Sequence, residues 1–490
     1  MNRIYRLFAA LSLAALGVLP AQAHSGKARF HVIVDTDCAA DDLRALCMLL
    51  GNREVEVLAV VSSDGALPPR EGARRVAALL RDFYHEGIPV GAGRPTCPAA
   101  PLWRERSRAV DWGDWGDTTR LATNFPPAAE LVAQALRGED EQVVYLALGA
   151  LTNLCDLLQS DSALGKRIDR VVWYNDSCRP LAGANYDADR DAAHWLLDSG
   201  LAVDVVSAHS GYPVRIDRAL LDTLATVPGP YARRIVDTHN RSPLVGSIGS
   251  GHMTAWDDLV VLSLFAPELF SWRPVGGNVR TGTLADEASA RQVPERIVAV
   301  LRGRPDSESR VFFGFPCSAS LYAADVAPLV DTVIARHGLS EWRAGVLTNE
   351  LHGHLGIYAT IGVKMGLRAR EWFDIGVDDI EVVTHAGLRP PVSCLNDGLQ
   401  VGTGASVGHG LIRVETCDEP RPEACFTFKG RTIRLTLKPE YARRIRDDVQ
   451  LGIRRYGDLT EPYWQYVRGL ALRYWRDFDR HEIFDLCVEP

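Results

Sequence analysis

The sequence predicts an α/β protein with a mostly parallel open sheet flanked by helices, followed by a smaller α+β domain. From residue 30 onward, short β-branched runs alternate with amphipathic segments, which is the pattern of βαβ units in a parallel sheet. After about residue 340, Gly-rich turns and strands replace this alternation. The length of 490 residues exceeds what one hydrophobic core usually serves, so two domains are expected.

The first domain is expected to span residues 27–340. Five short β-branched runs predict its strands: FHVIVD, VEVLAVVSS, QVVYLALG, IDRVVWY and LAVDVVS. Helical spacing of apolar residues is seen between them in DDLRALCMLLG, REGARRVAALLRDFY and DRDAAHWLLDSG. A last strand and helix are predicted at RVFFGFP and DVAPLVDTVIARHG. Ligands of such sheets bind at the carboxyl ends of the strands, so a site is expected there.

The second domain is expected to span residues 341–490. HGHLGIYATIGVKMGL predicts a loop that runs into a helix, and CFTFKG and TIRLTL predict strands. Cys417 and Cys425 flank the Pro-rich loop CDEPRPEAC and are expected to form a disulfide in an oxidising compartment. The other cysteines show no disulfide spacing and are expected to be buried small apolar residues.

Residues 1–23 predict a cleavable signal peptide. Arg3 and Arg6 precede a 13-residue apolar core at residues 7–19, and Ala21 and Ala23 form a small-x-small cleavage site. A membrane anchor is the alternative, but 13 residues fall short of the roughly 20 that cross a bilayer. We therefore expect a periplasmic or secreted protein, cleaved after Ala23, with no membrane span.

The overall charge argues against a nucleic-acid partner. The chain has 62 acidic and 54 basic residues, for a formal net charge of −8. Nucleic-acid binders typically carry a basic surface that attracts phosphates. A small-molecule partner is expected instead.

Four carboxylates crowd the end of the first predicted strand, in VIVDTDCAADD. They belong to Asp35, Asp37, Asp41 and Asp42. Hard oxygen ligands at this density favour Ca²⁺ or Mg²⁺, which would offset their repulsion. The alternative is a solvated helix N-terminus, where Asp41 and Asp42 would interact favourably with the helix dipole.

Four motifs in order resemble the nucleoside hydrolase family, whose members cleave the N-glycosidic bond of ribonucleosides. DTDCAADD resembles the family signature DTDPGxDD, and LGALTNL resembles its GPLTN segment. NYDADRDAA (185–193) and WDDLVVLSLFAPELF (256–270) resemble two later segments. The resemblance covers residues 30 to 340 and implies a family tendency to form homo-oligomers.

The resemblance implies a Ca²⁺ site and a general base. The implied Ca²⁺ ligands are the carboxylates of Asp37, Asp42 and Asp257 and the backbone carbonyl of Thr152. Asp37 would also take a proton from the attacking water, while Asp35 and Asp41 would support the site or bind ribose hydroxyls. Asn185 matches the family asparagine that binds ribose; capping a helix near Asp187 is its alternative role.

Two positions resemble the purine-preferring, inosine-adenosine-guanosine branch. Trp256 stands where most members have a histidine, and a tryptophan there stacks on the base. Asp64, in VVSSDG, matches an aspartate of the same branch. Trp103 or Trp112 would supply the opposite face of a sandwich, although a loop aromatic also serves as a packing anchor.

Two departures from the family pattern affect the ribose end. The family glutamate two residues before Asn185 falls on Gly183, and the preceding segment is about five residues shorter than in the family. Asn175 or Asp176 would then replace the missing ribose contact. Ala39 stands in the Pro-Gly turn of the signature.

The second domain resembles the family named after the E-type component of formylmethanofuran dehydrogenase over residues 346 to 440. LHGHLG and PPVSCLNDGLQVGTGASVGHG carry this resemblance. It implies a second metal site, with Zn²⁺ as the expected ion and four candidate ligands: His352, His354, Cys394 and His409. Ala405 replaces a family cysteine, so a scaffold with an altered or lost metal site is the alternative.

Two hypotheses follow for the whole chain. The first is a Ca²⁺-dependent hydrolase of a purine ribonucleoside or related riboside, fused to a metal-binding module. The second is a non-catalytic periplasmic protein that binds or scavenges a metal or metallocofactor. Gly183, Ala405 and the export signal motivate the second hypothesis.

Overall fold

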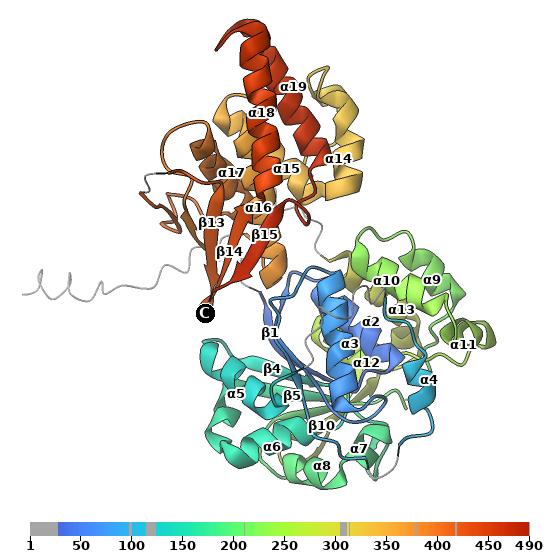
Figure 1. Cartoon of the computed structure of the whole chain (residues 1–490). Coiled ribbons are helices and arrows are strands. Elements are labelled where there is room, and N and C mark those ends of the chain that lie inside the picture. Colours follow the sequence, from blue (N-terminus) through green and yellow to red (C-terminus); the bar gives the residue numbers. More distant parts are fainter. Residues whose placement is uncertain are drawn as a thin grey trace, which may run out of the picture.

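The computed structural model describes residues 28–97, 100–113, 124–209, 211–303, 311–312, 314–377, 380–416 and 419–489. These residues form two domains, each with its own hydrophobic core (Figure 1). The predicted signal peptide and Cys417 lie outside the described residues. None of the described helices is long and apolar enough to cross a membrane.

The first domain contains an eight-stranded sheet in the order β3-β2-β1-β4-β5-β8-β10-β9. All neighbouring strands are parallel except β9, which pairs antiparallel with β10. The five predicted strands are confirmed. The bounds are β1 (Phe30–Thr36), β2 (Val55–Ser62), β3 (Val90–Ala92), β4 (Val143–Ala147), β5 (Ile168–Tyr174), β8 (Val203–Val206), β9 (Phe270–Gly276) and β10 (Val279–Leu284). A short hairpin, β6 (Ser177–Cys178) and β7 (Leu181–Ala182), follows β5.

Helices cover both faces of this sheet (Figure 1). Alternate residues of β1 point to opposite faces: Val32 and Val34 pack in one core cluster and Ile33 in another. The central strands are apolar along their whole length because both faces are buried. The helices are α2 (Ala40–Leu50), α3 (Pro69–Asp82), α4 (Arg104–Arg108), α5 (Ala128–Gly138), α6 (Thr152–Ser160), α7 (Ala184–Ala188), α8 (Arg190–Leu197), α9 (Arg218–Leu224), α10 (Pro230–His239), α11 (Leu244–Ser250), α12 (Asp257–Phe265) and α13 (Glu287–Arg302).

The second domain contains a five-stranded sheet in the order β12-β11-β13-β14-β15. β12 is parallel to β11, and the other pairs are antiparallel. The strands are β11 (Glu381–Thr384), β12 (Ile412–Val414), β13 (Glu423–Phe428), β14 (Arg431–Leu437) and β15 (Phe484–Val488). The helices are α14 (Val330–His337), α15 (Leu339–His352), α16 (Ile357–Phe373), α17 (Leu395–Thr403), α18 (Pro439–Tyr456) and α19 (Glu461–Asp477). The smaller domain is therefore α+β, as predicted.

The segment between the domains differs from the sequence-based expectation. RVFFGFP forms no strand in its described residues, and Val311 and Phe312 are exposed. The helix predicted after it is α14, but Val330 and Val333 pack in the core of the second domain. The apolar run was misread because its side chains find no sheet to pair with. The strand and helix thus do not close the first domain.

The second domain contacts the first at the end of the sheet where the strands begin. Lys429, in the turn between β13 and β14, binds Glu56 and Glu139 at 2.5 Å each, near the starts of β2 and β4. The Gly87 amide, before β3, donates to the Trp372 carbonyl at 2.9 Å. A Cβ on Gly87 would lie 2.3 Å from that oxygen, so glycine permits this close approach.

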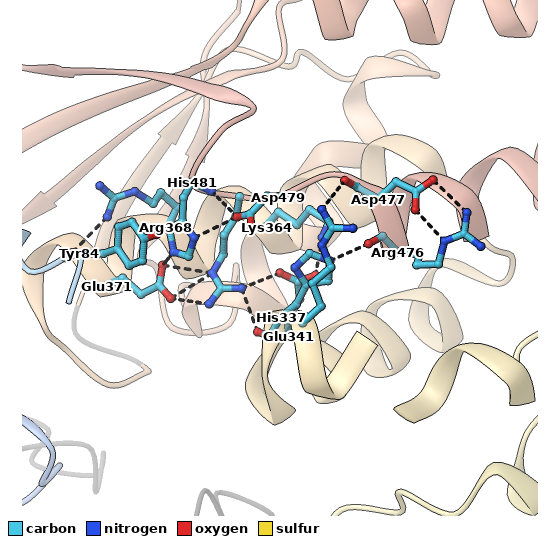
Figure 2. Close-up of polar contacts among 12 residues, drawn as sticks. Tyr84, His337, Glu341, Lys364, Arg368, Glu371, Arg476, Asp477, Asp479 and His481 are labelled. Atoms are coloured by element: carbon cyan, nitrogen blue, oxygen red, sulfur yellow. Dashed lines mark hydrogen bonds and ion pairs between the residues drawn. The ribbon is translucent and has the colours of Figure 1, made fainter. Parts of the chain in front are cut away.

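A buried charge network in the second domain supports this contact (Figure 2). His481 binds Glu371 at 3.0 Å, and its ring stacks on Tyr84 of the first domain with centroids 3.5 Å apart. Lys364 forms a fully buried ion pair with Glu341, which also binds Arg480 at 3.0 Å. The network therefore links the core of the second domain to a loop of the first.

Candidate active site

A cavity of about 450 Å³ opens at the carboxyl ends of the parallel strands. It is bordered by Asp37 directly after β1, Leu148 after β4, and Tyr174 at the end of β5. The volume lies within the range of small-molecule sites. The cavity occupies the position where ligands bind in open parallel sheets.

Three carboxylates converge at one end of this cavity. Asp41 and Asp42 lie in the first turn of α2, and Asp257 begins α12, which packs against α2. One oxygen from each lies within 4.8 Å of the other two, so the three could hold a metal ion. Helix packing thus brings together residues that are more than two hundred positions apart in the chain.

Asp37 lines the same cavity but is held separately from this group. Its Oδ1 accepts a hydrogen bond from the Ala39 amide at 3.2 Å, and its Oδ2 accepts one from Ala66 at 3.0 Å. A Cβ on Gly65 would lie 2.1 Å from Oδ2, so the loop can only approach the carboxylate with glycine there. The carboxylate of Asp37 is therefore fixed in direction.

The metal ligands implied by the sequence are brought together only in part. Asp42 and Asp257 share the group of three with Asp41, whereas Asp37 is not one of the three. Thr152 begins α6, where its hydroxyl donates to Asp189 at 2.8 Å. Thr152 is not among the described residues that line the cavity.

Burial and mutual repulsion raise the pKa values of these carboxyl groups. Burial raises the pKa of Asp37 to about 7; backbone hydrogen bonds oppose this shift, and the charge of Asp41 adds to it. Burial and neighbouring carboxylates raise the pKa values of Asp42 and Asp257 well above their usual range. A cation among them would reverse this effect by stabilising the charged forms.

The donor set fits a hard divalent cation. Asp257 Oδ1 is buried and has no hydrogen-bond partner among the described residues, which leaves it available as a ligand. Arg44 lies nearby, but its Nε and Nη2 bind Asp258 at 2.9 and 2.7 Å. The positive charge of Arg44 is thus directed to a different carboxylate. Carboxylate oxygens are the ligands that Ca²⁺ and Mg²⁺ prefer.

Asp35, the first acid of the cluster, is directed into the protein. The Tyr145 hydroxyl donates to it at 2.7 Å and the Asn153 amide at 3.1 Å. It is not among the described residues that line the cavity, so it supports the site from behind.

Asn185 lies beside the cavity with its amide group oriented by the backbone. Its Nδ2 donates to the carbonyls of Leu148 at 2.8 Å and Tyr174 at 3.0 Å, which leaves Oδ1 for other partners. The residue lies inside α7, whose N-cap is Gly183, so its side chain does not cap this helix.

The shortened loop before Asn185 explains the glycine at position 183. Gly183 has φ 139°, and a Cβ there would lie 2.6 Å from Asn175 Oδ1. Asn175 lines the cavity, but its amide binds Ser177 and Ala182 and holds the hairpin. Asp176 also lines the cavity and is partly exposed, so it is the more available of the two proposed replacements.

The other end of the cavity is aromatic. Trp103 and Trp256 both line it and are 45% and 38% exposed, so their rings are available to a ligand. Trp112 is buried in the core and is not among the described lining residues. Asp64 is also buried away from the cavity lining, where it binds Arg104 at 2.6 Å and accepts two backbone hydrogen bonds.

The sequence analysis missed four cavity residues at this aromatic end: Arg106, Ser247, His252 and Met253. They lie in two segments, RERSR and SIGSGHM, that match none of the recognised motifs. The only available signal was position, because RERSR follows Trp103 directly and SIGSGHM ends three residues before Trp256.

The four candidate ligands of the second domain do not converge. No group of three potential ligands within 4.8 Å, among the described residues, contains any of His352, His354, Cys394 or His409. The rings of His352 and His354 lie 4.3 Å apart, and His352 Nδ1 binds Asp397 Oδ2 at 2.7 Å. His352 Nε2 is buried without a partner in the described structure.

Comparison with known proteins identifies the family of each domain. Residues 32–306 match the inosine-uridine preferring nucleoside hydrolases, and this match covers more than half of the chain. The chain belongs to this family and is a hydrolase acting on N-glycosyl compounds. Residues 351–455 match the FmdE family, named for the molybdenum formylmethanofuran dehydrogenase operon. Both predicted resemblances are confirmed.

Relatives include pyrimidine-specific ribonucleoside hydrolases named RihA. The protein from Shewanella baltica is 28% identical over 258 residues, which is 49% of this chain and 79% of the relative. The one from Salmonella paratyphi A is 27% identical over 258 residues, with 49% and 81% covered. A solved structure, the purine-preferring ribonucleoside hydrolase from Gardnerella vaginalis, is 17% identical with a TM-score of 0.46, covering 56% of this chain and 99% of that one.

Proposed function

We propose that this chain hydrolyses the N-glycosidic bond of a purine ribonucleoside or a related riboside with the help of Ca²⁺. The observation that carries the proposal is one cavity with two unlike ends. One end holds the convergent carboxylates of Asp41, Asp42 and Asp257 beside the oriented Asp37. The other end presents two exposed tryptophan side chains.

The convergent carboxylates would hold the Ca²⁺. Asp42 and Asp257 are its proposed central ligands, with Asp41 beside them; Asp37 and the Thr152 carbonyl complete the set implied by the family resemblance. When bound, the ion supplies positive charge that keeps the buried carboxylates ionised and attracts ribose oxygens.

Asp37 is the proposed general base. Its two backbone hydrogen bonds leave it pointing into the cavity, where it can take a proton from a water molecule. The water oxygen forms a bond to C1′ as the bond from C1′ to the base nitrogen breaks. The base leaves with the electron pair of that bond and takes up a proton. Positive charge on the sugar is then stabilised by the surrounding carboxylates.

The ribose and the base are placed at opposite ends of the cavity. Asn185 Oδ1 and Asp41 are the proposed acceptors of ribose hydroxyl hydrogen bonds. Trp103 and Trp256 would stack on the two faces of the base, which favours the larger ring system of a purine. Asp64 is bound to Arg104, so the purine proposal rests on the tryptophans rather than on Asp64.

The proposal is tested with purified protein, Ca²⁺ and a nucleoside panel in a reducing-sugar assay. The Asp37→Asn variant is expected to lose about 10²- to 10⁴-fold in rate, the usual contribution of a positioned base. Asp191→Asn, on the exposed side of α8, is the matched control and is expected to keep wild-type activity. If the wild-type protein releases sugar from no nucleoside or related riboside, the proposal fails.

The second candidate function is binding without turnover. The observation that favours it is Gly183, where the tight hairpin leaves no room for the glutamate side chain of the family. Calorimetry that shows uptake of a nucleoside without sugar release would support this alternative. Rapid hydrolysis would exclude it.

A metal in the second domain is a separate proposal. His352 resembles a metal ligand because a carboxylate orients one ring nitrogen while the other is buried without a partner among the described residues. Zn²⁺ is the proposed ion, with His354, Cys394 and His409 as further candidate ligands. Elemental analysis of the wild-type protein and a His352→Ala variant tests this, and equal metal content in both would contradict it.

The location and assembly of the protein also remain proposals. The signal-like segment at residues 1–23 supports export to the periplasm or beyond. Determination of the N-terminal residue of the mature protein tests cleavage after Ala23. Light scattering of the purified protein tests the homo-oligomer expected from the family resemblance.

A further inference from the structure

Charge is unevenly distributed around the cavity. Its acidic lining comes from the segment at residues 37–42 and from Asp176 and Asp257. Arg106 is the one arginine or lysine among the described lining residues, and it stands with Trp103 on the opposite side, on or beside α4. A ligand that fills the cavity therefore meets carboxylates at its sugar end and a guanidinium at its base end.

Arg106 differs from its neighbours on α4 in having no carboxylate partner in the described part of the chain. Arg104 binds Asp64, and Arg108 binds Glu71 at 3.1 Å. The single hydrogen bond recorded for Arg106 runs from Nη2 to the hydroxyl of Ser247, on α11. Ser247 occupies one of five N–H donors, so the others remain for a ligand.

His252 adds a second polar group at this end. It lines the cavity, and its Nδ1 lies 2.7 Å from the Ser250 hydroxyl, which orients the ring. The polar groups around the tryptophans are thus a guanidinium, an imidazole and a serine hydroxyl rather than carboxylates.

We propose that Arg106 determines base specificity by binding the O6 and N7 acceptors of a 6-oxopurine. This inference rests on the proposed hydrolysis and names its substrate class: inosine-type and guanosine-type ribosides, with adenosine disfavoured. A guanidinium has donors only, and its fork matches the paired acceptors O6 and N7. Adenine presents an amino donor beside N7, which would leave one N–H of Arg106 facing another donor.

The same contact assists departure of the base. As the glycosidic bond breaks, its electron pair moves onto the purine and increases the negative charge on N7 and O6. A fixed cation at these atoms stabilises that charge without transferring a proton. Removal of Arg106 should therefore slow cleavage of oxopurine ribosides more than it weakens the stacking of any base.

The test compares kcat/KM for inosine and adenosine in the full-length protein with Ca²⁺. The wild-type protein should prefer inosine by about 10- to 100-fold, the discrimination typical of a bidentate arginine contact to a base edge. Arg106→Gln should lower kcat/KM for inosine and leave adenosine nearly unchanged, so the preference collapses. Arg106→Lys keeps the charge without the fork and should recover rate more than selectivity. Arg108→Gln, on the same helix and outside the described cavity lining, is the matched control and should keep the preference.

A second readout does not depend on turnover. Binding of free hypoxanthine and adenine is measured by tryptophan fluorescence quenching, and only the hypoxanthine affinity should fall in Arg106→Gln. If the wild-type protein hydrolyses nothing but shows this selective binding, the proposed function fails while the role of Arg106 stands.

Three results would overturn the inference. An equal loss for inosine and adenosine in Arg106→Gln would assign Arg106 a structural role through Ser247. A wild-type preference for adenosine or cytidine would exclude oxopurine recognition. A preference for inosine 5′-monophosphate over inosine that disappears in Arg106→Gln would place a phosphate, rather than the base, against the guanidinium.

Discussion

Substitution of Gly65 by alanine tests whether the fixed direction of Asp37 matters for hydrolysis. The backbone of Gly65 is not left-handed, so alanine is compatible with its conformation. The new Cβ would lie 2.1 Å from Asp37 Oδ2 and 2.7 Å from its Cγ. The loop cannot easily withdraw, because Arg104 donates to the Gly65 carbonyl at 2.8 Å and the next amide, of Ala66, binds Asp37. The Asp37 carboxylate must therefore move.

The size of this movement sets the expected effect. Ordinary contact between such atoms begins near 3.4 Å, so the carboxylate must shift by about 1 Å. A displacement of 1 Å in a catalytic group can lower the rate by about 10²-fold. We expect kcat/KM for inosine to fall by this factor at saturating Ca²⁺, while far-UV circular dichroism shows a folded protein.

Gly138→Ala is the matched control for this experiment. A Cβ on Gly138, at the end of α5, meets no atom within 4 Å, so activity should equal that of the wild-type protein. Wild-type kcat/KM in a folded Gly65→Ala protein would refute the reasoning, because the carboxylate would then tolerate displacement or not take part.

Two further predictions concern the buried network of the second domain (Figure 2). Glu341 pairs with both Lys364 and Arg480, so Glu341→Gln leaves two buried cations and should cost about 3–5 kcal/mol in urea unfolding. Lys364→Met leaves the glutamate paired with Arg480 and should cost less; the reverse order would contradict this account. Burial lowers the pKa of His481, but hydrogen bonds to two carboxylates raise it further, so the net pKa lies above 6.5. Its stabilising contribution is full below pH 6.5 and is lost as the pH rises through the raised pKa, so the Tm difference between wild type and His481→Gln should shrink toward alkaline pH.

The central strands could be read from the sequence because their burial on both faces leaves a local signal. Val32, Ile33 and Val34 form one apolar run, since neighbouring residues of β1 face two different cores. The same signal misled at residues 310–316, where Val311 and Phe312 are exposed. Apolar composition records what a segment can bury, and does not record whether a partner strand is present.

The candidate site was predictable where residues follow a strand directly and less so where helices assemble it. Asp37 and Asp42 were identified from the crowding of acids after β1. The grouping of Asp41 with Asp257 depends on the packing of α2 against α12, and no local pattern encodes that contact. The pairing of Asp64 with Arg104 was likewise hidden, because an ion pair across 40 residues leaves no periodic trace.

The two ends of β1 separate the cavity from the second domain. His31, near the start of this strand, lies 3.2 Å from Glu139, which binds Lys429 of the second domain. Asp37 follows the other end of β1 and lines the cavity. Six residues of extended chain span about 20 Å, which is farther than any side chain reaches. No described residue of the second domain lines the cavity. In this arrangement the second domain supplies no group to hydrolysis, and any effect it has on the cavity must pass through the stability of the shared sheet.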